Sequence, residues 1–96
     1  MVTQFIQSYS HALSGLRLVN DYFDTSDVVV VDSPRLTDFN DLNYYHYDAI
    51  KFKIIKTADT LYSYASQGDT QCILKASYKL STQNIVLSNV SFYTSN

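Results

Sequence analysis

The chain contains no glutamate: all nine of its acidic residues are aspartate. Aspartate favours turns and helix caps, whereas glutamate favours helix interiors, so the bias indicates little exposed helix. It also fits the skewed codon pool of a virus or phage genome, which is our hypothesis for the source. Without glutamate, a calcium loop of the EF-hand type lacks its bidentate ligand. We therefore interpret the repeat of Asp21, Asp24 and Asp27 as a solvated turn.

Cysteine and glycine are scarce, with one and two residues respectively. The single Cys72 excludes an internal disulfide and favours a reducing, cytoplasmic location. Two glycines leave no glycine-rich phosphate loop, and two histidines with one cysteine show no zinc-ligand spacing. No apolar run approaches the roughly 20 residues that span a membrane, and the N-terminus lacks a signal-peptide pattern. The sequence predicts no cofactor, no metal site, no catalytic residue and no membrane contact.

Residues 2–23 have the clearest helical periodicity in the chain. Apolar side chains recur there at spacings of three and four, which predicts one amphipathic helix. They are Val2, Phe5, Ile6, Tyr9, Leu13, Leu16, Val19 and Phe23. Gly15 costs about 1 kcal/mol against alanine inside a helix, so it marks either a close packing contact or an early end.

The remaining sequence predicts strands. Residues 28–31 form a β-branched run typical of a buried strand, and residues 35–45 are expected to be a connecting loop with at most one helical turn. Alternating patterns then predict strands at 47–57, 60–66, 71–80 and 85–94, with a hairpin turn at 66–69 that uses Gly68.

One helix followed by a meander can bury its apolar stripe only against one face of a sheet. We therefore predict that residues 1–96 form a single α+β domain, with a long N-terminal helix on a curved antiparallel sheet of about four to five strands. This arrangement has an architectural analogy in cystatin-like folds and in folds like that of nuclear transport factor 2. The analogy concerns the fold alone and implies no function.

The predicted registers gather lysines and tyrosines on the sheet face away from the helix. These residues are Lys51, Lys53, Lys75, Lys79, Tyr62 and Tyr64. Such a face could bind single-stranded nucleic acid by phosphate attraction and base stacking, or it could be an ordinary solvated sheet face. The net charge of −2 and the isoelectric point of about 5.4 disfavour nucleic acid as the partner.

Tyr44, Tyr45, His46 and Tyr47 form the densest aromatic cluster, with Asp48 beside it. Exposed tyrosines are efficient interface residues, but the same rings could equally close one end of the core. Both interpretations stay open, and this cluster is the first predicted binding surface.

The charges are unevenly distributed along the chain. Residues 1–48 carry seven aspartates and two arginines, a net charge of −5, whereas residues 49–96 carry two aspartates and five lysines, a net charge of +3. Such halves can steer two copies together. We predict a non-enzymatic protein-interaction module that binds a host protein or itself as a homo-oligomer. The alternatives are a ligand-binding or catalytic cavity between helix and sheet, with His46 or Asp48 as a buried polar group, and single-stranded nucleic-acid binding.

Overall fold

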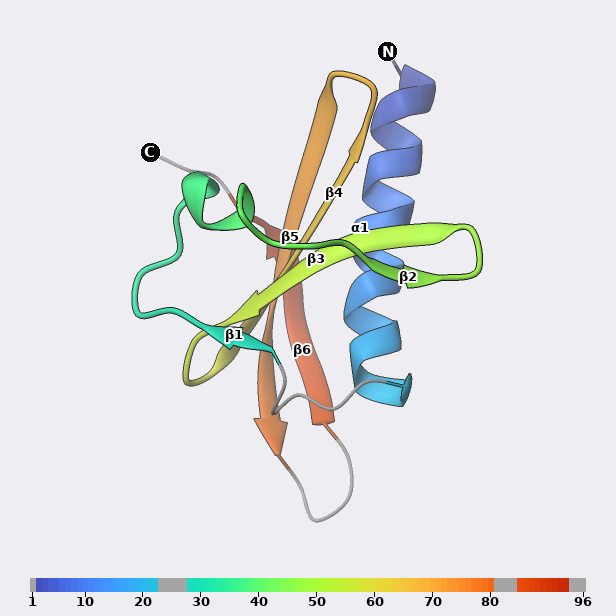
Figure 1. Cartoon of the computed structure of the whole chain (residues 1–96). Helices are drawn as coiled ribbons and strands as arrows, with labels where there is room; N and C mark the ends of the chain where they lie inside the picture. Colours follow the sequence, from blue (N-terminus) through green and yellow to red (C-terminus); the bar gives the residue numbers. More distant parts are fainter. Residues whose placement is uncertain (1, 23–27, 81–84, 94–96) are drawn as a thin grey trace.

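One long helix lies against one face of a twisted sheet in the computed structural model, which describes residues 2–22, 28–80 and 85–93 (Figure 1). The helix α1 spans Val2–Tyr22, so the predicted N-terminal helix and the α+β class are confirmed. The other elements are β1 (Val29–Val30), the short 3-10 helix η2 (Leu36–Phe39), β2 (Tyr45–Tyr47), β3 (Ile50–Lys56), β4 (Thr60–Gln67), β5 (Thr70–Leu80) and β6 (Ile85–Phe92).

The sheet is open, with the strand order β1-β3-β4-β5-β6, and β2 also pairs with β3. The pairs from β2 to β6 are antiparallel, as predicted, whereas β1 pairs with β3 in parallel. The sheet is therefore mixed, because the chain crosses from β1 through η2 before it reaches β3. Gly68 has a φ of 58° in the two-residue connection of β4 and β5, which confirms the predicted glycine turn.

The first core lies between α1 and the sheet. Its buried members are Ala12, Leu16, Leu18, Val19, Val28, Phe52, Ile54, Leu61, Ala65, Cys72, Leu74 and Ala76. The members from β3, β4 and β5 belong to the inward sets that the sequence predicts, which confirms those registers. On α1 only Leu16 and Val19 of the predicted stripe are buried, because the buried face is turned toward Ala12 and Leu18 and leaves Phe5 and Ile6 exposed. Gly15 is the predicted close packing contact, since a Cβ there would lie 2.7 Å from the ring of Phe52. Within the described residues, no helix combines the length and apolar character needed to cross a membrane.

Two hairpins contact α1. The turn between β4 and β5 rises beside the N-terminal half of α1 (Figure 1), where the Ser8 hydroxyl donates to the Thr70 carbonyl at 3.1 Å. One turn further along the same side of the helix, the backbone N–H of Lys51 donates to His11 Nδ1 at 3.5 Å. These contacts fix the rotation of α1 on the sheet, and the rotation determines which of its side chains remain exposed.

A second core covers much of the opposite sheet face. Phe39, Ile55, Tyr64 and Ile73 are buried there. Val31, Leu42, Tyr44, Tyr62 and Tyr93 pack around them. The expected connecting loop at 35–45 is therefore a covering layer, and the interpretation of this face as simply solvated is wrong at these positions. The ring of Phe39 stacks on Tyr64 at a centroid distance of 5.3 Å, which anchors the layer to the sheet.

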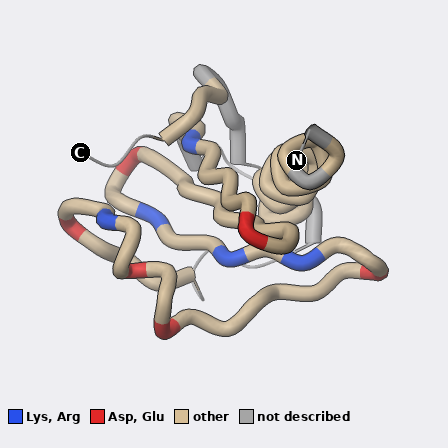
Figure 2. The backbone as a smooth tube through the Cα atoms, turned by 90° about the horizontal axis from the view of Figure 1, so that it is seen from above, with Lys and Arg blue, Asp and Glu red and all other residues tan. Residues whose placement is uncertain are grey.

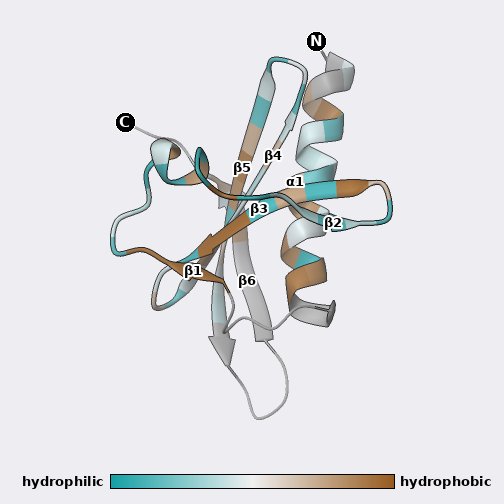
Figure 3. Cartoon of the chain, viewed as in Figure 1, coloured by the Kyte–Doolittle hydropathy of each residue, from teal (hydrophilic) through white to brown (hydrophobic). Residues whose placement is uncertain are grey.

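The predicted buried strand at 28–31 is corrected by the structure. Val29 and Val30 form β1 at the rim of the sheet and are 47% and 62% exposed. In the hydropathy colouring, β1 stands out as a strongly hydrophobic segment (Figure 3). Only the flanking valines face inward: Val28 belongs to the first core and Val31 packs on the second. Since β1 has a strand neighbour on one side only, its own side chains gain little cover.

The strand predicted at 47–57 is divided into β2 and β3. The break is a two-residue turn at Asp48 and Ala49, in which Asp48 has a φ of 57°. Aspartate tolerates this left-handed conformation better than most residues without being glycine. Because the turn contains no glycine, the sequence gives no sign of it, and the alternation of apolar and polar residues continues across residues 48 and 49.

Candidate binding surfaces

The predicted aromatic cluster is divided between the two cores and the solvent. Tyr44 packs on the second core, and its hydroxyl lies 3.2 Å from Ser66 Oγ. Tyr45 faces the first core, where it stacks on Phe52 at 5.7 Å. His46, Tyr47 and the neighbouring Asp48 are exposed. Of the two interpretations left open, core closure describes Tyr44 and Tyr45, which are half-buried, and the second half of the cluster is the more exposed.

Two members of the predicted lysine and tyrosine face belong to the second core. Tyr64 is 9% exposed. The Lys53 ammonium donates to the Phe39 carbonyl at 2.8 Å and lies 4.8 Å from the centre of the Tyr44 ring. These contacts hold the covering layer on the sheet, so the Lys53 ammonium is engaged within the protein and the buried Tyr64 ring is not exposed for stacking on a base.

The remaining members of that face do not form one cluster. Lys51 is exposed at the start of β3, with its ammonium 5.0 Å from the centre of the Tyr44 ring. Tyr62 and Lys75 are opposite partners on β4 and β5. Lys79 is in β5, but its side chain is outside the described part of the structure. The structure therefore brings Tyr62 and Lys75 together and separates Lys51 from them.

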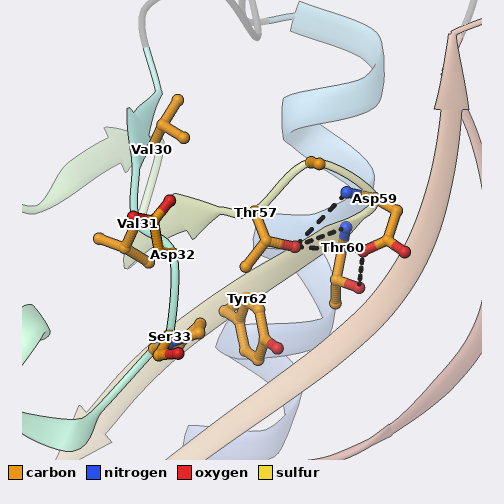
Figure 4. A pocket seen from close by; sticks show the side chains of 10 residues that line it. Val30, Val31, Asp32, Ser33, Thr57, Asp59, Thr60 and Tyr62 are labelled. Carbon is orange, nitrogen blue, oxygen red and sulfur yellow. Dashed lines mark hydrogen bonds between the residues drawn. The ribbon is translucent and has the colours of Figure 1, made fainter.

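Tyr62 lies in the floor of a groove on the sheet face opposite α1. A hollow of about 700 Å³ extends to one side of its ring, lined by residues 30–34 and 57–60 (Figure 4). A second hollow of about 250 Å³ extends to the other side, lined by Lys75, Ser77 and Ser91. Thr60 and Tyr62 line both hollows, so the two hollows are direct neighbours, and we refer to them together as the groove.

Both walls of the groove are fixed by hydrogen bonds. Thr57 and Thr60 donate their hydroxyls to Asp59 Oδ1 at 3.2 and 3.0 Å. The opposite wall is held by the Tyr93 hydroxyl, which donates to the Pro34 carbonyl at 2.5 Å. Partial burial, and then the neighbouring Tyr93 and Asp59, raise the pKa of Tyr62, so its hydroxyl stays protonated at neutral pH.

An exposed aromatic patch lies on the helix side, where α1 meets β6. We define this patch as Phe5, Ile6, Tyr9 and Phe92. The ring of Phe92 lies 6.2 Å from that of Phe5 and 5.7 Å from that of Tyr9. Phe5, Ile6 and Phe92 nevertheless remain 46%, 57% and 51% exposed. Side chains of this size are rarely left so open together unless something covers them.

The two segments that carry the aromatic patch contain no charged side chain. Every aspartate, lysine and arginine of the chain lies between Arg17 and Lys79, so residues 1–16 and 80–96 are free of them. The view down α1 shows this directly: its N-terminal turns carry no charge, while the coloured positions follow the strands and loops (Figure 2). This patch is not among the surfaces predicted from the sequence, although the two uncharged ends of the chain are visible there.

The histidine, cysteine and aspartate side chains of the described part lie apart from one another. Within 2–22, 28–80 and 85–93, no three histidine, cysteine or aspartate side chains gather as metal ligands. Asp24 and Asp27, with the side chain of Asp21, lie outside the described residues. Cys72 is buried in the first core at 4% exposure, whereas His46 is exposed, so they form no pair.

We expect the Cys72 thiol to react slowly in the folded protein. Burial raises its pKa, which keeps the nucleophilic thiolate scarce at neutral pH. Labelling with a chromogenic disulfide reagent should be slower in native buffer than in denaturant by about 100-fold or more, since reaction requires an opening of the core. Equal rates in the two conditions would show that Cys72 is accessible.

No family model matches the chain, and no match is found among the curated proteins or the solved structures.

Proposed function

We propose that the chain is a non-enzymatic protein-interaction module that pairs with a second copy of itself through the aromatic patch. The observation that carries the proposal is the joint exposure of Phe5, Ile6 and Phe92 on a surface built from uncharged segments. Two such patches can pack against each other without burying a charged side chain. Burial of an unpaired charge would strongly oppose the association. A domain of this size also gains from added apolar burial, because its own core is small.

The neighbouring sheet edge supports pairing between like surfaces. β6 ends the strand order and, among the described strands, pairs with β5 alone. Two β6 strands that pair antiparallel about a twofold axis would continue the sheet and leave both copies of α1 on the same face. Phe92 opposes Leu74, so it faces the helix side, where Phe5 and Tyr9 stand. The patch and the edge could then be covered in one interface.

The alternatives have less support from the described surfaces. The cavity hypothesis expects His46 or Asp48 as a buried polar group, and both are exposed. Nucleic-acid binding expects a shared face of lysines and tyrosines, and Lys53 and Tyr64 serve the second core. The phage or viral origin and the cytoplasmic location remain predictions from composition. The charge split is absent from the patch, so it is not what would join two copies there.

The test is a charge placed within the patch. We expect Ile6→Glu to weaken self-association by about 100-fold or more, because pairing would then bury an uncompensated carboxylate. Sedimentation velocity over a wide concentration range measures the monomer–dimer equilibrium. Ile6 is 57% exposed in the single copy, so the variant should fold normally.

Gln7→Glu is the matched control, since it adds the same charge to the neighbouring residue. Gln7 is exposed and lies one helical turn before His11, on the flank that faces β3. It should dimerise as the unmodified protein does. If the unmodified protein stays monomeric at the highest concentration, or if both variants dissociate equally, the proposal is wrong.

A further inference from the structure

The groove around Tyr62 has opposite charges at its two ends. Asp32 and Asp59 line the larger hollow. Lys75 lines the smaller one. Both aspartates and Lys75 are exposed to solvent, whereas the Tyr62 ring between them is half-buried. The residues lining the larger hollow include no lysine or arginine, so that hollow is negative without an internal counter-charge.

Hydrogen bonds within the protein hold the Asp59 carboxylate, at the acidic end of the groove, in a fixed position. Both threonine hydroxyls donate to Asp59 Oδ1, which leaves Oδ2 free, among the described residues, to accept from a ligand. The turn that carries Asp59 is further fixed from β5, since the Tyr78 N–H donates to the Asp59 carbonyl at 2.9 Å. The Tyr62 ring offers an aromatic surface beside these carboxylates, a combination that favours ammonium and guanidinium groups.

We propose that this groove binds an extended peptide segment of a partner protein, with a basic side chain at Asp32 and Asp59 and an acidic side chain at Lys75. Two features favour a peptide over a compact ligand. The two hollows are neighbours across β4 and β5, with Thr60 and Tyr62 shared between them, so a ligand that fills both must be elongated. Its charge changes sign along its length, which matches an extended chain better than a single charged group.

The site does not depend on self-association. Tyr62 and Lys75 point to the sheet face away from α1, whereas Phe92 points toward it. A peptide in the groove and a second copy on the aromatic patch would therefore occupy opposite faces. Ile6→Glu should leave peptide binding unchanged, so failure of this proposal can be told apart from failure of the proposed pairing.

The experiment is a titration of the isotope-labelled full chain with short capped peptides, followed by amide chemical shifts. The probes carry one arginine and one aspartate separated by one, two or three alanines. We expect at least one spacing to give saturable shifts confined to residues 31–34, 57–62 and 75–77. Asp32→Asn and Lys75→Gln should each weaken that binding by about two- to fivefold, as for exposed ion pairs, and added salt should weaken it further.

Matched controls carry the same charge changes elsewhere. Asp69→Asn and Lys51→Gln alter exposed residues outside the groove and should leave the affinity unchanged. Asp59 is left intact because its carboxylate also holds the turn. The proposal is overturned if no spacing produces saturable shifts in the groove, or if a peptide with glutamine in place of arginine binds equally well. Arginine amide binding as tightly as the best peptide would also overturn it, because the site would then take a small cation.

Discussion

Replacing Gly15 by alanine is expected to destabilise the protein by about 2 kcal/mol or more, although alanine is the better helix former. The added Cβ would lie 2.6 Å from Ser63 Oγ and 2.7 Å from two ring carbons of Phe52. Ser63 and Phe52 are both fully buried, on β4 and β3, so neither can move into solvent to make room. The clash outweighs the roughly 1 kcal/mol that alanine returns in helix propensity.

Urea unfolding measures this effect, and the neighbouring residue supplies the control. Ser14 is half-buried, in the same turn of α1, and Ser14→Ala should leave the free energy of unfolding unchanged or raise it by a few tenths of a kcal/mol. If Gly15→Ala proved as stable as Ser14→Ala, α1 would not lie as close to β3 and β4 as the structure places it.

Phe39→Ala should lower the free energy of unfolding by about 3 kcal/mol and loosen the covering layer. Phe39 is 1% exposed, stacks on Tyr64, and its backbone carbonyl accepts the Lys53 ammonium. Removing the ring leaves a cavity between the layer and the sheet. Amide exchange should then speed up across residues 31–44 before it changes in α1, because the first core is untouched.

Leu36→Ala is the comparison within the same 3-10 helix. Leu36 is 40% exposed, so its truncation should cost less than about 1 kcal/mol. Equal losses for the two variants would mean that η2 does not dock through Phe39. The outer face of the sheet would then be open, as the sequence alone suggests.

The first core could be predicted from sequence because its signals are periodic. Residues 71–80 alternate, and the inward set includes Cys72, Leu74 and Ala76, all buried. Gly68 likewise marks the hairpin, because its role depends only on local backbone geometry. The period of residues 2–23 predicts the helix itself, but not its exact buried face: Leu16 and Val19 are buried, whereas Phe5 and Ile6 are exposed.

The second core could not be predicted in this way. Phe39 stands alone in a segment rich in aspartate and asparagine, with no period to show that it is buried. Ile55, Tyr64 and Ile73 read as an outward set until the covering layer is placed on them. The parallel pairing of β1 and the turn at Asp48 likewise depend on tertiary contacts and backbone geometry, which no local pattern displays.

The candidate sites show the same division. The sequence correctly placed Tyr62 and Lys75 on one face, because they are register partners. The sequence does not show that the Lys53 ammonium binds a backbone carbonyl of the layer that covers that face. The aromatic patch was missed because Phe5 and Ile6 fit the apolar stripe of α1. Only the position of β6 shows that the apolar stripe of α1 extends beyond the edge of the sheet.

Self-association through the aromatic patch is the central claim, and contacts between copies test it most directly. An isotope-filtered nuclear Overhauser experiment on an equal mixture of labelled and unlabelled chains detects only contacts between different copies. We expect such contacts between the Ile6 methyl groups of one copy and the rings of Phe5 and Phe92 of its partner. An absence of intermolecular contacts at millimolar concentration, or contacts confined to other residues, would contradict the claim.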